Sequence, residues 1–197
     1  AINKGSTTVD GITTKVVKNG VRQFTGTDRT NFFTNLYDHD IPAAGTPLRE
    51  ATISVGEYFK RTDDQGPWGQ TPGSTGGTQH ECRQNFNILM TDGYWTEGSI
   101  SGMDNSDNQS GSTITNDSSP ATPASYTYSP SSPYSDAYSD TLADVAMHYW
   151  KNDLRTDMLN KVPTNAHDPA FWQHLVNFTV GLGVTGSLSS LPSGSGS

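Results

Sequence analysis

The chain is poor in charge and has no long apolar run. Only 16% of its 197 residues are charged, and 12 Lys and Arg against 20 Asp and Glu give a formal net charge of −8. Nucleic acids and anionic membrane surfaces both require clustered positive charge, so we expect neither as a partner. No apolar run approaches the roughly 18 residues of a membrane-spanning helix, so we expect no transmembrane segment. The sequence begins at Ala1 without a basic and apolar leader, and we expect any export signal to have been removed or to lie outside it.

Cysteine is nearly absent as well. The single residue, Cys82, cannot form a disulfide within the chain. Two interpretations stay open, a buried free thiol and a disulfide with a cysteine outside the printed sequence. Thiols of exported proteins tend to be oxidised, and we predict the disulfide.

Hydrophobic residues make up only 31% of the chain, enough for one domain with a lean core. We assign residues 1–186 to this domain and the Ser- and Gly-rich residues 187–197 to a linker or tail. Between about 99 and 135 the sequence is dominated by Ser, Asp, Pro and Tyr, a composition that cannot build a core of its own. We expect this low-complexity insertion to be mobile and easily cut by proteases.

The first half of the chain predicts a hairpin and two helices. Asn19-Gly20 separates two β-prone runs within residues 15–24, which is typical of a hairpin with a type I′ turn. Thr27 or Asp28 can cap a helix whose apolar stripe comprises Phe32, Phe33, Leu36 and Tyr37. In the next helix Thr46 is expected as the N-cap and Pro47 as the first helical residue. Its buried face is expected to comprise Leu48, Ala51, Val55 and Phe59.

The second half predicts two apolar strands separated by helices. The first strand is the run from Phe86 to Met90, and the second lies within residues 175–183. Ser139 or Asp140 is expected to cap a helix with Leu142, Val145, Ala146, Tyr149 and Trp150 on one face. Asp168-Pro169 is expected to open a short helical turn through Phe171 and Trp172.

Apolar strands that alternate with helices predict an α/β fold with a parallel sheet, because helices then cover both faces of the sheet. In such sheets ligands bind just beyond the carboxyl ends of the strands. Thr91-Asp92-Gly93 stands at such an end, so we expect the Asp92 carboxylate to face a crevice and hold a ligand. Asp-Gly is also a common turn pair, and a purely structural role for Asp92 stays open.

Four segments carry a resemblance to a known family. They read NFNILMTDGYW, GTPLREA, YSDTLADVAMHYWKNDLR and DPAFWQHLVNFTVGLGV. They resemble the von Willebrand factor A (VWA) fold and, more narrowly, the VWA region of the PilC/PilY family, the adhesin-like proteins at the tips of bacterial type IV pili. The similarity runs from about Gly20 to Gly183 and is interrupted by the insertion.

The resemblance implies a doubly wound, mostly parallel sheet flanked by helices, with a β-hairpin at its N-terminus. It also implies an extracellular location, at the pilus tip or the bacterial cell surface. The expected function is adhesion and pilus biogenesis without catalysis, and the expected partners are minor pilins or a surface receptor.

Many VWA domains hold a divalent metal ion, and the resemblance implies Mg²⁺, with Mn²⁺ or Ca²⁺ as alternatives. Thr46 matches the second metal-binding loop of such domains and Asp92 the third. The first loop, Asp-x-Ser-x-Ser, is missing, and the nearest string, residues 104–108, follows the Thr-Asp-Gly strand, so we interpret it as a coincidence. The chain therefore resembles a VWA domain without its first strand and first helix, which residues outside the printed sequence would supply.

Two alternatives to a metal-dependent adhesion module stay open. In the first, the domain contributes to pilus assembly or priming through protein contacts without a metal ion, and Thr46 is then simply a helix cap. The missing first loop favours this alternative. The second is a metal-assisted hydrolase, which is disfavoured because His39 and His80 lack metal-ligand spacing and no serine stands in a G-x-S-x-G motif.

Overall fold

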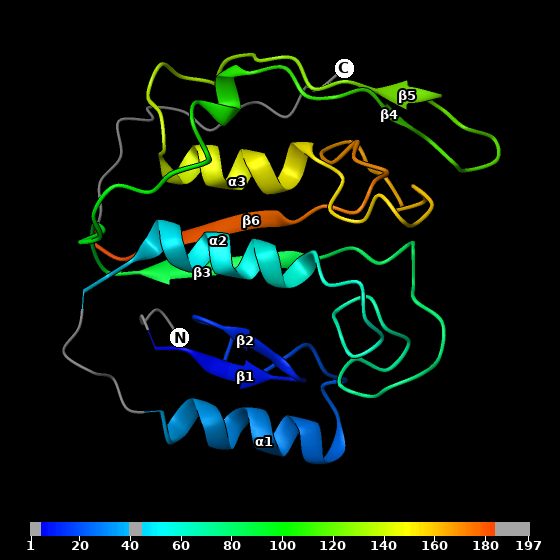
Figure 1. The fold of residues 1–197 in the computed structure, drawn as a ribbon. Helices are drawn as coiled ribbons and strands as arrows, with labels where there is room; N and C mark the ends of the chain where they lie inside the picture. The colour runs from blue at the N-terminus through cyan, green and yellow to red at the C-terminus, as the bar shows by residue number, and fades with distance from the viewer. Residues whose placement is uncertain (1–4, 40–44, 184–197) are drawn as a thin grey trace. The chain divides into compact units, whose positions relative to one another are not determined.

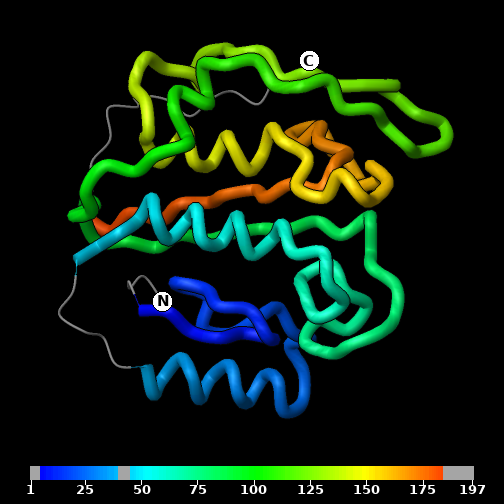
Figure 2. The backbone as a smooth tube through the Cα atoms, in the orientation of Figure 1, coloured from blue at the N-terminus to red at the C-terminus, as the bar shows by residue number. Residues whose placement is uncertain are grey.

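The computed structural model describes residues 5–39 and 45–183, and the predicted tail at 187–197 lies outside them. The chain divides into two compact units (Figures 1 and 2). Unit 1 comprises Ala1–His80 and Trp95–Glu97, and unit 2 comprises Glu81–Tyr94 and Gly98–Ser197. No helix in the described ranges is long and apolar enough to cross a lipid bilayer.

Unit 1 begins with an antiparallel hairpin of β1 (Thr7–Val9) and β2 (Ile12–Thr14). Its turn is Asp10-Gly11, and both residues have the positive φ that a type I′ turn requires, 50° and 80°. The prediction of a hairpin at Asn19-Gly20 is wrong, because residues 15–24 contain no strand. There the Arg22 guanidinium instead donates hydrogen bonds to the Asp10 carboxylate, which ties this segment to the turn of the true hairpin.

Two helices follow, α1 (Gly26–Tyr37) and α2 (Leu48–Phe59). The N-cap of α1 is Thr25, not Thr27 or Asp28. Its predicted apolar stripe faces water, since no residue of α1 is buried. The α2 helix does bury Leu48, Ala51 and Phe59, as the sequence predicts, whereas Val55, the fourth residue of the predicted face, is half-buried. Its N-cap is Pro47 rather than Thr46, and the cap residue makes no side-chain hydrogen bond to the helix.

The core of unit 1 lies where α2 meets the loop that follows it. Trp68 is completely buried in that loop, and its indole N–H donates to the carbonyl oxygen of Phe59 over 2.7 Å. The guanidinium of buried Arg61 donates to the carbonyl oxygens of Val9 and Asp10, at 3.2 and 2.9 Å. These bonds fasten the hairpin to the end of α2.

Unit 2 contains a parallel pair, β3 (Phe86–Thr91) and β6 (Val176–Gly181), in register from Phe86 opposite Val176 to Thr91 opposite Gly181. Helix α3 (Leu142–Lys151) lies along β6 (Figure 1). The structure is therefore mixed α/β with a parallel pair, as the alternating pattern predicts. The larger doubly wound sheet is not present among the described residues, which form sheets of two strands only.

Two details of unit 2 differ from the sequence predictions. Helix α3 is capped by Thr141, not Ser139 or Asp140, because Thr141 and Asp144 form a capping box in which each side chain binds the other residue's backbone N–H. Residues 168–175 contain no helix. The Asp168 carboxylate accepts from the Ala170 N–H and the Trp150 indole N–H, and the chain continues extended into β6.

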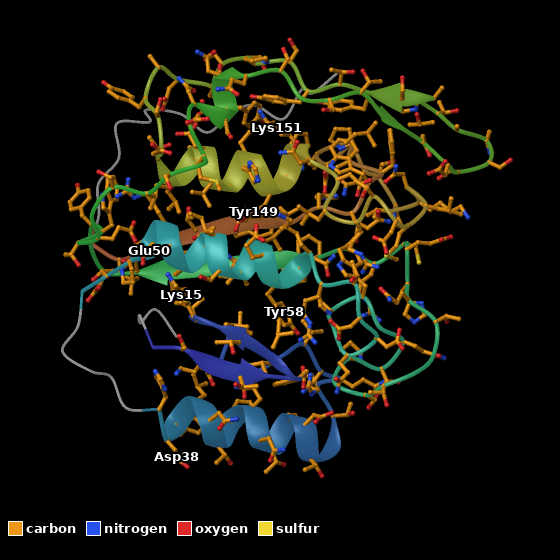
Figure 3. All side chains as sticks on the ribbon, in the orientation of Figure 1. Lys15, Asp38, Glu50, Tyr58, Tyr149 and Lys151 are labelled. Carbon is orange, nitrogen blue, oxygen red and sulfur yellow. The ribbon has the colours of Figure 1, made fainter. Side chains whose placement is uncertain are left out.

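The low-complexity insertion contains short elements of structure and several buried side chains. It contains a short 3₁₀ helix η1 (Ser106–Asn108) and a small antiparallel pair, β4 (Ile114–Thr115) and β5 (Ser125–Tyr126). Its buried side chains include Ile100, Met103, Asp107, Ile114 and Tyr128. The Lys151 ammonium, at the end of α3 (Figure 3), donates to the carbonyl oxygens of Ser106 and Gln109 at 2.6 and 2.9 Å. The insertion therefore packs against α3 and does not build a core by itself. Its mobility and ready cleavage by proteases stay predictions.

Candidate partner-binding site

Asp92 lies where the sequence predicts, directly after the carboxyl end of β3. The hydroxyl of Thr91 accepts from the Gly93 N–H at 3.2 Å and donates to the Gly93 carbonyl oxygen at 2.9 Å, so Thr91 closes the turn. Asp92 is exposed, and its carboxylate makes no hydrogen bond or ion pair within the described chain. A turn-forming Asp uses its own carboxylate to bind the backbone. Here Thr91 has that role, which leaves the Asp92 carboxylate available to a ligand.

One face of the β3–β6 pair is apolar and exposed. Residues opposite each other in the register share this face: Phe86 with Val176, Ile88 with Phe178, and Met90 with Val180. We call Phe86, Ile88, Met90, Phe178 and Val180 the β3–β6 apolar face. Their exposed fractions run from 39% for Val180 to 65% for Ile88, and the rings of Phe86 and Phe178 lie 6.1 Å apart.

The other face of the pair contributes to unit 2. Leu89 is buried on it, and the Asn87 amide donates to the Asn177 side-chain oxygen at 2.8 Å. Strands of parallel sheets are normally covered on both faces. Among the described residues β3 and β6 pair only with each other, so each also has an unpaired edge. The sequence prediction of a fully buried strand is therefore wrong for Phe86, Ile88 and Met90.

Thr46 lies at the start of α2, in contact with residues 95–97. Its N–H donates to the Thr96 hydroxyl at 2.6 Å, and its carbonyl oxygen accepts from the Thr96 N–H at 3.1 Å. The adjacent Glu97 carboxylate accepts from the N–H groups of Arg49 and Glu50, at 2.9 and 3.3 Å, and from Nε of Arg49 at 2.7 Å. Glu97 therefore provides the acceptors that a capping side chain would otherwise supply.

The described residues do not make a complete metal site. Thr46 belongs to unit 1 and Asp92 to unit 2, and each offers a single ligating side chain. Mg²⁺ prefers six oxygen ligands in octahedral array, and even with several waters it is usually held by one or two carboxylates and further oxygens. Within residues 5–39 and 45–183 no group of three or more His, Cys, Asp or Glu side chains is placed to hold a metal ion. The donors present therefore do not fit Mg²⁺ without further ligands.

Cys82 is exposed, which excludes the buried-thiol interpretation. Its disulfide with a cysteine outside the printed sequence stays a prediction.

Sequence reasoning missed three buried groups that connect segments of the fold: Glu97, Lys151 and His174. Each is charged or titratable and buried, and each binds backbone or side-chain atoms of another segment. Charged residues are almost never fully buried unless they are paired, and their partners here are distant in the sequence. The local hydrophobic pattern therefore gives no sign that they are buried. Only the folded chain identifies them.

The described residues define a mixed α/β protein with an exposed carboxylate at a strand end and an exposed apolar sheet face. No protein-family model matches the chain, and no solved structure matches it significantly. The sequence is similar to the type IV pilus biogenesis factor PilY1 of Pseudomonas aeruginosa. It is 38% identical to the protein of strain PAK over 205 aligned residues, which cover 96% of this chain. It is 40% identical to that of strain PAO1 over 188 residues and 87% of the chain.

The chain spans only 17% and 15% of the length of these two relatives. By this similarity the chain belongs to the PilY1 family. Most of each relative lies outside the compared region.

Proposed function

We propose that this chain is part of a VWA-like binding module in a longer PilY1-type protein and serves adhesion and type IV pilus biogenesis without catalysis. The observation that carries the proposal is the similarity to PilY1 at 38% identity over 96% of the chain. Its partners would be minor pilins or a surface receptor. Its location would be extracellular, at the pilus tip or cell surface.

The structure supports separate roles for two parts of β3. The exposed Asp92 carboxylate, at the carboxyl end, would contact the partner, because ligands of parallel sheets bind beyond the strand ends. The β3–β6 apolar face would be covered by residues of the longer polypeptide, because exposed apolar faces of this kind mark interaction sites and parallel sheets are covered on both sides. The neighbouring strand that a VWA sheet requires would come from the same region.

A divalent metal ion would need ligands from outside the printed sequence. Thr46 and Asp92 would supply one oxygen ligand each, and Mg²⁺, Mn²⁺ or Ca²⁺ would add an open coordination position for an acidic group of the partner. The second candidate function is a metal-free structural module. The missing Asp-x-Ser-x-Ser loop favours it, and a requirement for metal ions distinguishes the two.

Genetic complementation tests the proposal. In a bacterium that lacks the full-length parent protein, we would express that protein with Ile88→Glu and count surface pili. We expect pili to be lost while the protein is still exported, because a charge on the apolar face prevents its coverage. The matched control is Leu159→Glu, which places the same charge on a side chain that is 47% exposed elsewhere in unit 2. Equal piliation of both variants and the wild type would contradict the proposal.

A further inference from the structure

A pocket of about 630 Å³ lies in unit 1, between the β1–β2 hairpin, residues 18–24 and helix α1 (Figure 1). Every residue that lines it belongs to this unit. The volume is within the range of pockets that bind small molecules, about 300–1,000 Å³. The pocket includes neither Asp92 nor any residue of the β3–β6 apolar face, so the roles proposed above leave it unexplained.

Helix α1 turns a largely polar face to this pocket. Asp28, Asn31, Phe32 and Asn35 line it, and their spacing of three and four residues places them on one side of the helix. A helix normally turns an apolar face toward the rest of its domain, yet no residue of α1 is buried. Asparagine also favours helices less than most residues do. Departures from such local rules are expected at functional sites, and lining a cavity accounts for both asparagines.

The wall opposite α1 is fixed by bonds within unit 1. The Arg22 guanidinium donates to both carboxylate oxygens of Asp10, whose side chain is only 9% exposed. The Val21 N–H donates to the Tyr58 hydroxyl at 2.9 Å. A β-carbon at Gly20 would lie 2.5 Å from Oδ2 of Asp10, so glycine lets the chain pass close to the ion pair. This wall is therefore formed before any ligand binds.

The charges that line the pocket balance. Lys18 and Arg22 are positive, and Asp10 and Asp28 are negative. Arg22 and Asp10 form an ion pair with each other, which leaves Lys18 and Asp28 as one charge of each sign. An anionic ligand would be attracted by Lys18 and repelled by Asp28, and a cationic ligand would meet the reverse. The lining therefore favours a neutral ligand.

Three amides and two aromatic rings supply the other contacts. The side chains of Asn19, Asn31 and Asn35 each carry donors and an acceptor. Asn35 donates to the Asn19 side-chain oxygen at 2.7 Å, whereas the Asn31 amide makes no side-chain bond within the described part of the chain. Phe24 and Phe32 are 56% and 40% exposed, and their ring centres lie 5.3 Å apart with the planes at 78°. The pocket thus offers directed hydrogen bonds beside exposed aromatic faces.

We propose that this pocket binds a neutral saccharide. Each hydroxyl group of a sugar both donates and accepts, as the asparagine amides do, and the C–H groups of the sugar ring can pack on an aromatic face. A purely apolar ligand would remove the amides from water without replacing their hydrogen bonds. Binding of a sugar does not rest on the pilus role proposed above.

NMR titration of the isotope-labelled 197-residue chain tests the proposal, with glucose, galactose, mannose and N-acetylglucosamine as probes. We expect at least one of them to bind with a Kd of about 1 mM and to shift the side-chain amide signals of Asn31 and Asn35. The side-chain amides of Asn87 and Asn177, in unit 2, should not shift. Glucuronate and glucosamine, which add a negative and a positive charge, should bind at least about tenfold more weakly.

A variant pair locates the binding. Asn31→Leu removes one amide at nearly constant size, and α1 should stay folded because leucine favours helices more than asparagine does. We expect sugar affinity to fall about five- to tenfold. The matched control is Thr30→Leu, which places the same side chain on α1 outside the pocket lining, and it should bind as wild type does.

Three results would overturn the proposal. The first is the absence of any signal shift with all four sugars at about 50 mM, far above the expected Kd. The second is binding of glucuronate or glucosamine as tight as that of the neutral sugars. The third is equal affinity of Asn31→Leu and the wild type. If Asn31→Leu does not fold, the wild-type titration with neutral and charged probes still decides the question.

Discussion

The imidazole of His174 and the carboxylate of Asp168 form a buried pair, with 2.9 Å between Nε2 and Oδ2. The second ring nitrogen of His174 lies 2.7 Å from the carbonyl oxygen of Trp172. Burial raises the pKa of Asp168, but the hydrogen bond and charge of His174, with the N–H groups of Ala170 and Trp150, outweigh burial and hold that pKa below its usual value. The pair fixes the segment that leads into β6.

We predict that this pair makes the stability of the chain sensitive to acid. A carboxyl group with a lowered folded-state pKa contributes stability above its unfolded pKa of about 3.9, and the contribution is lost as pH falls through the folded pKa. Asp168→Asn should therefore lower the free energy of unfolding by about 3 kcal/mol at pH 7, since it breaks a buried pair. The difference from wild type should shrink as the pH approaches about 3.

Urea unfolding of both proteins across this pH range measures the effect. Asp38→Asn, at an exposed residue after α1, is the control and should change stability by less than about 0.5 kcal/mol. A difference between Asp168→Asn and wild type that is constant with pH would contradict the prediction.

The hydrogen bonds of Lys151 should protect the insertion from proteases. Burial lowers the pKa of its ammonium, and the charges of Asp107 and Asp144 partly offset this effect. Lys151→Met should release the carbonyl oxygens of Ser106 and Gln109 and destabilise unit 2 by about 1–3 kcal/mol. Limited proteolysis with chymotrypsin should then cut near residues 103–110 several times faster than in wild type, where we expect cleavage after exposed residues such as Tyr134. Lys60→Met, at an exposed pair, should leave the cutting pattern unchanged.

We expect the reactivity of the Cys82 thiol to differ between this chain and the longer parent protein. In the 197-residue chain the exposed thiol should react with one equivalent of a thiol reagent without unfolding. In the exported parent protein, unreduced, the same titration should find Cys82 unreactive because it is in a disulfide. A reactive Cys82 in the parent would show that the predicted disulfide is absent.

If Asp92 is a metal ligand, metal ions should stabilise the folded protein and Asp92→Asn should reduce that stabilisation. In the longer polypeptide, a metal ion that binds only the folded state should raise the unfolding midpoint, and the stabilisation is about 2.7 kcal/mol when its concentration is 100 times Kd. Asp92→Asn should remove most of this increase and leave stability without metal unchanged or slightly improved. Thermal unfolding of both proteins with and without millimolar Mg²⁺ and Mn²⁺ measures the effect. A wild-type midpoint that neither ion changes would contradict metal binding and favour the metal-free structural module.

The local sequence pattern predicted β3, α2 and α3, whose formation depends mainly on neighbouring residues. The apolar run from Phe86 predicts β3, and helical spacing predicts α2 and α3. The predicted apolar faces are buried at Leu48, Ala51 and Phe59 of α2 and at Val145 and Tyr149 of α3, and their other members are half-buried. The hairpin was misplaced because the first 25 residues contain two Asx-Gly pairs, and of these only Asp10-Gly11 lies between strands that pair. Local sequence could not decide between them.

Long-range contacts explain most of the other differences. Glu97 caps α2 from 48 residues away, so Thr46 is not needed as the cap. His174 binds the Asp168 carboxylate, which the sequence assigned to a helix start. The exposed side of β3 could not be predicted, because an apolar run gives no sign of whether a covering segment is present. The position of Asp92 at the end of β3 was correct, because it depends only on where the strand stops.

We expect the β3–β6 apolar face to be covered in the longer PilY1-type protein. Met90 lies on this face and is 59% exposed, whereas Met103 is 8% exposed and serves as an internal control of the same chemistry. The decisive measurement is the rate of peroxide oxidation of both methionines, followed by mass spectrometry, in the 197-residue chain and in the longer polypeptide. If this face is covered, Met90 should be oxidised much faster than Met103 in the short chain and about as slowly as Met103 in the longer one. Equally fast oxidation of Met90 in both proteins would contradict it.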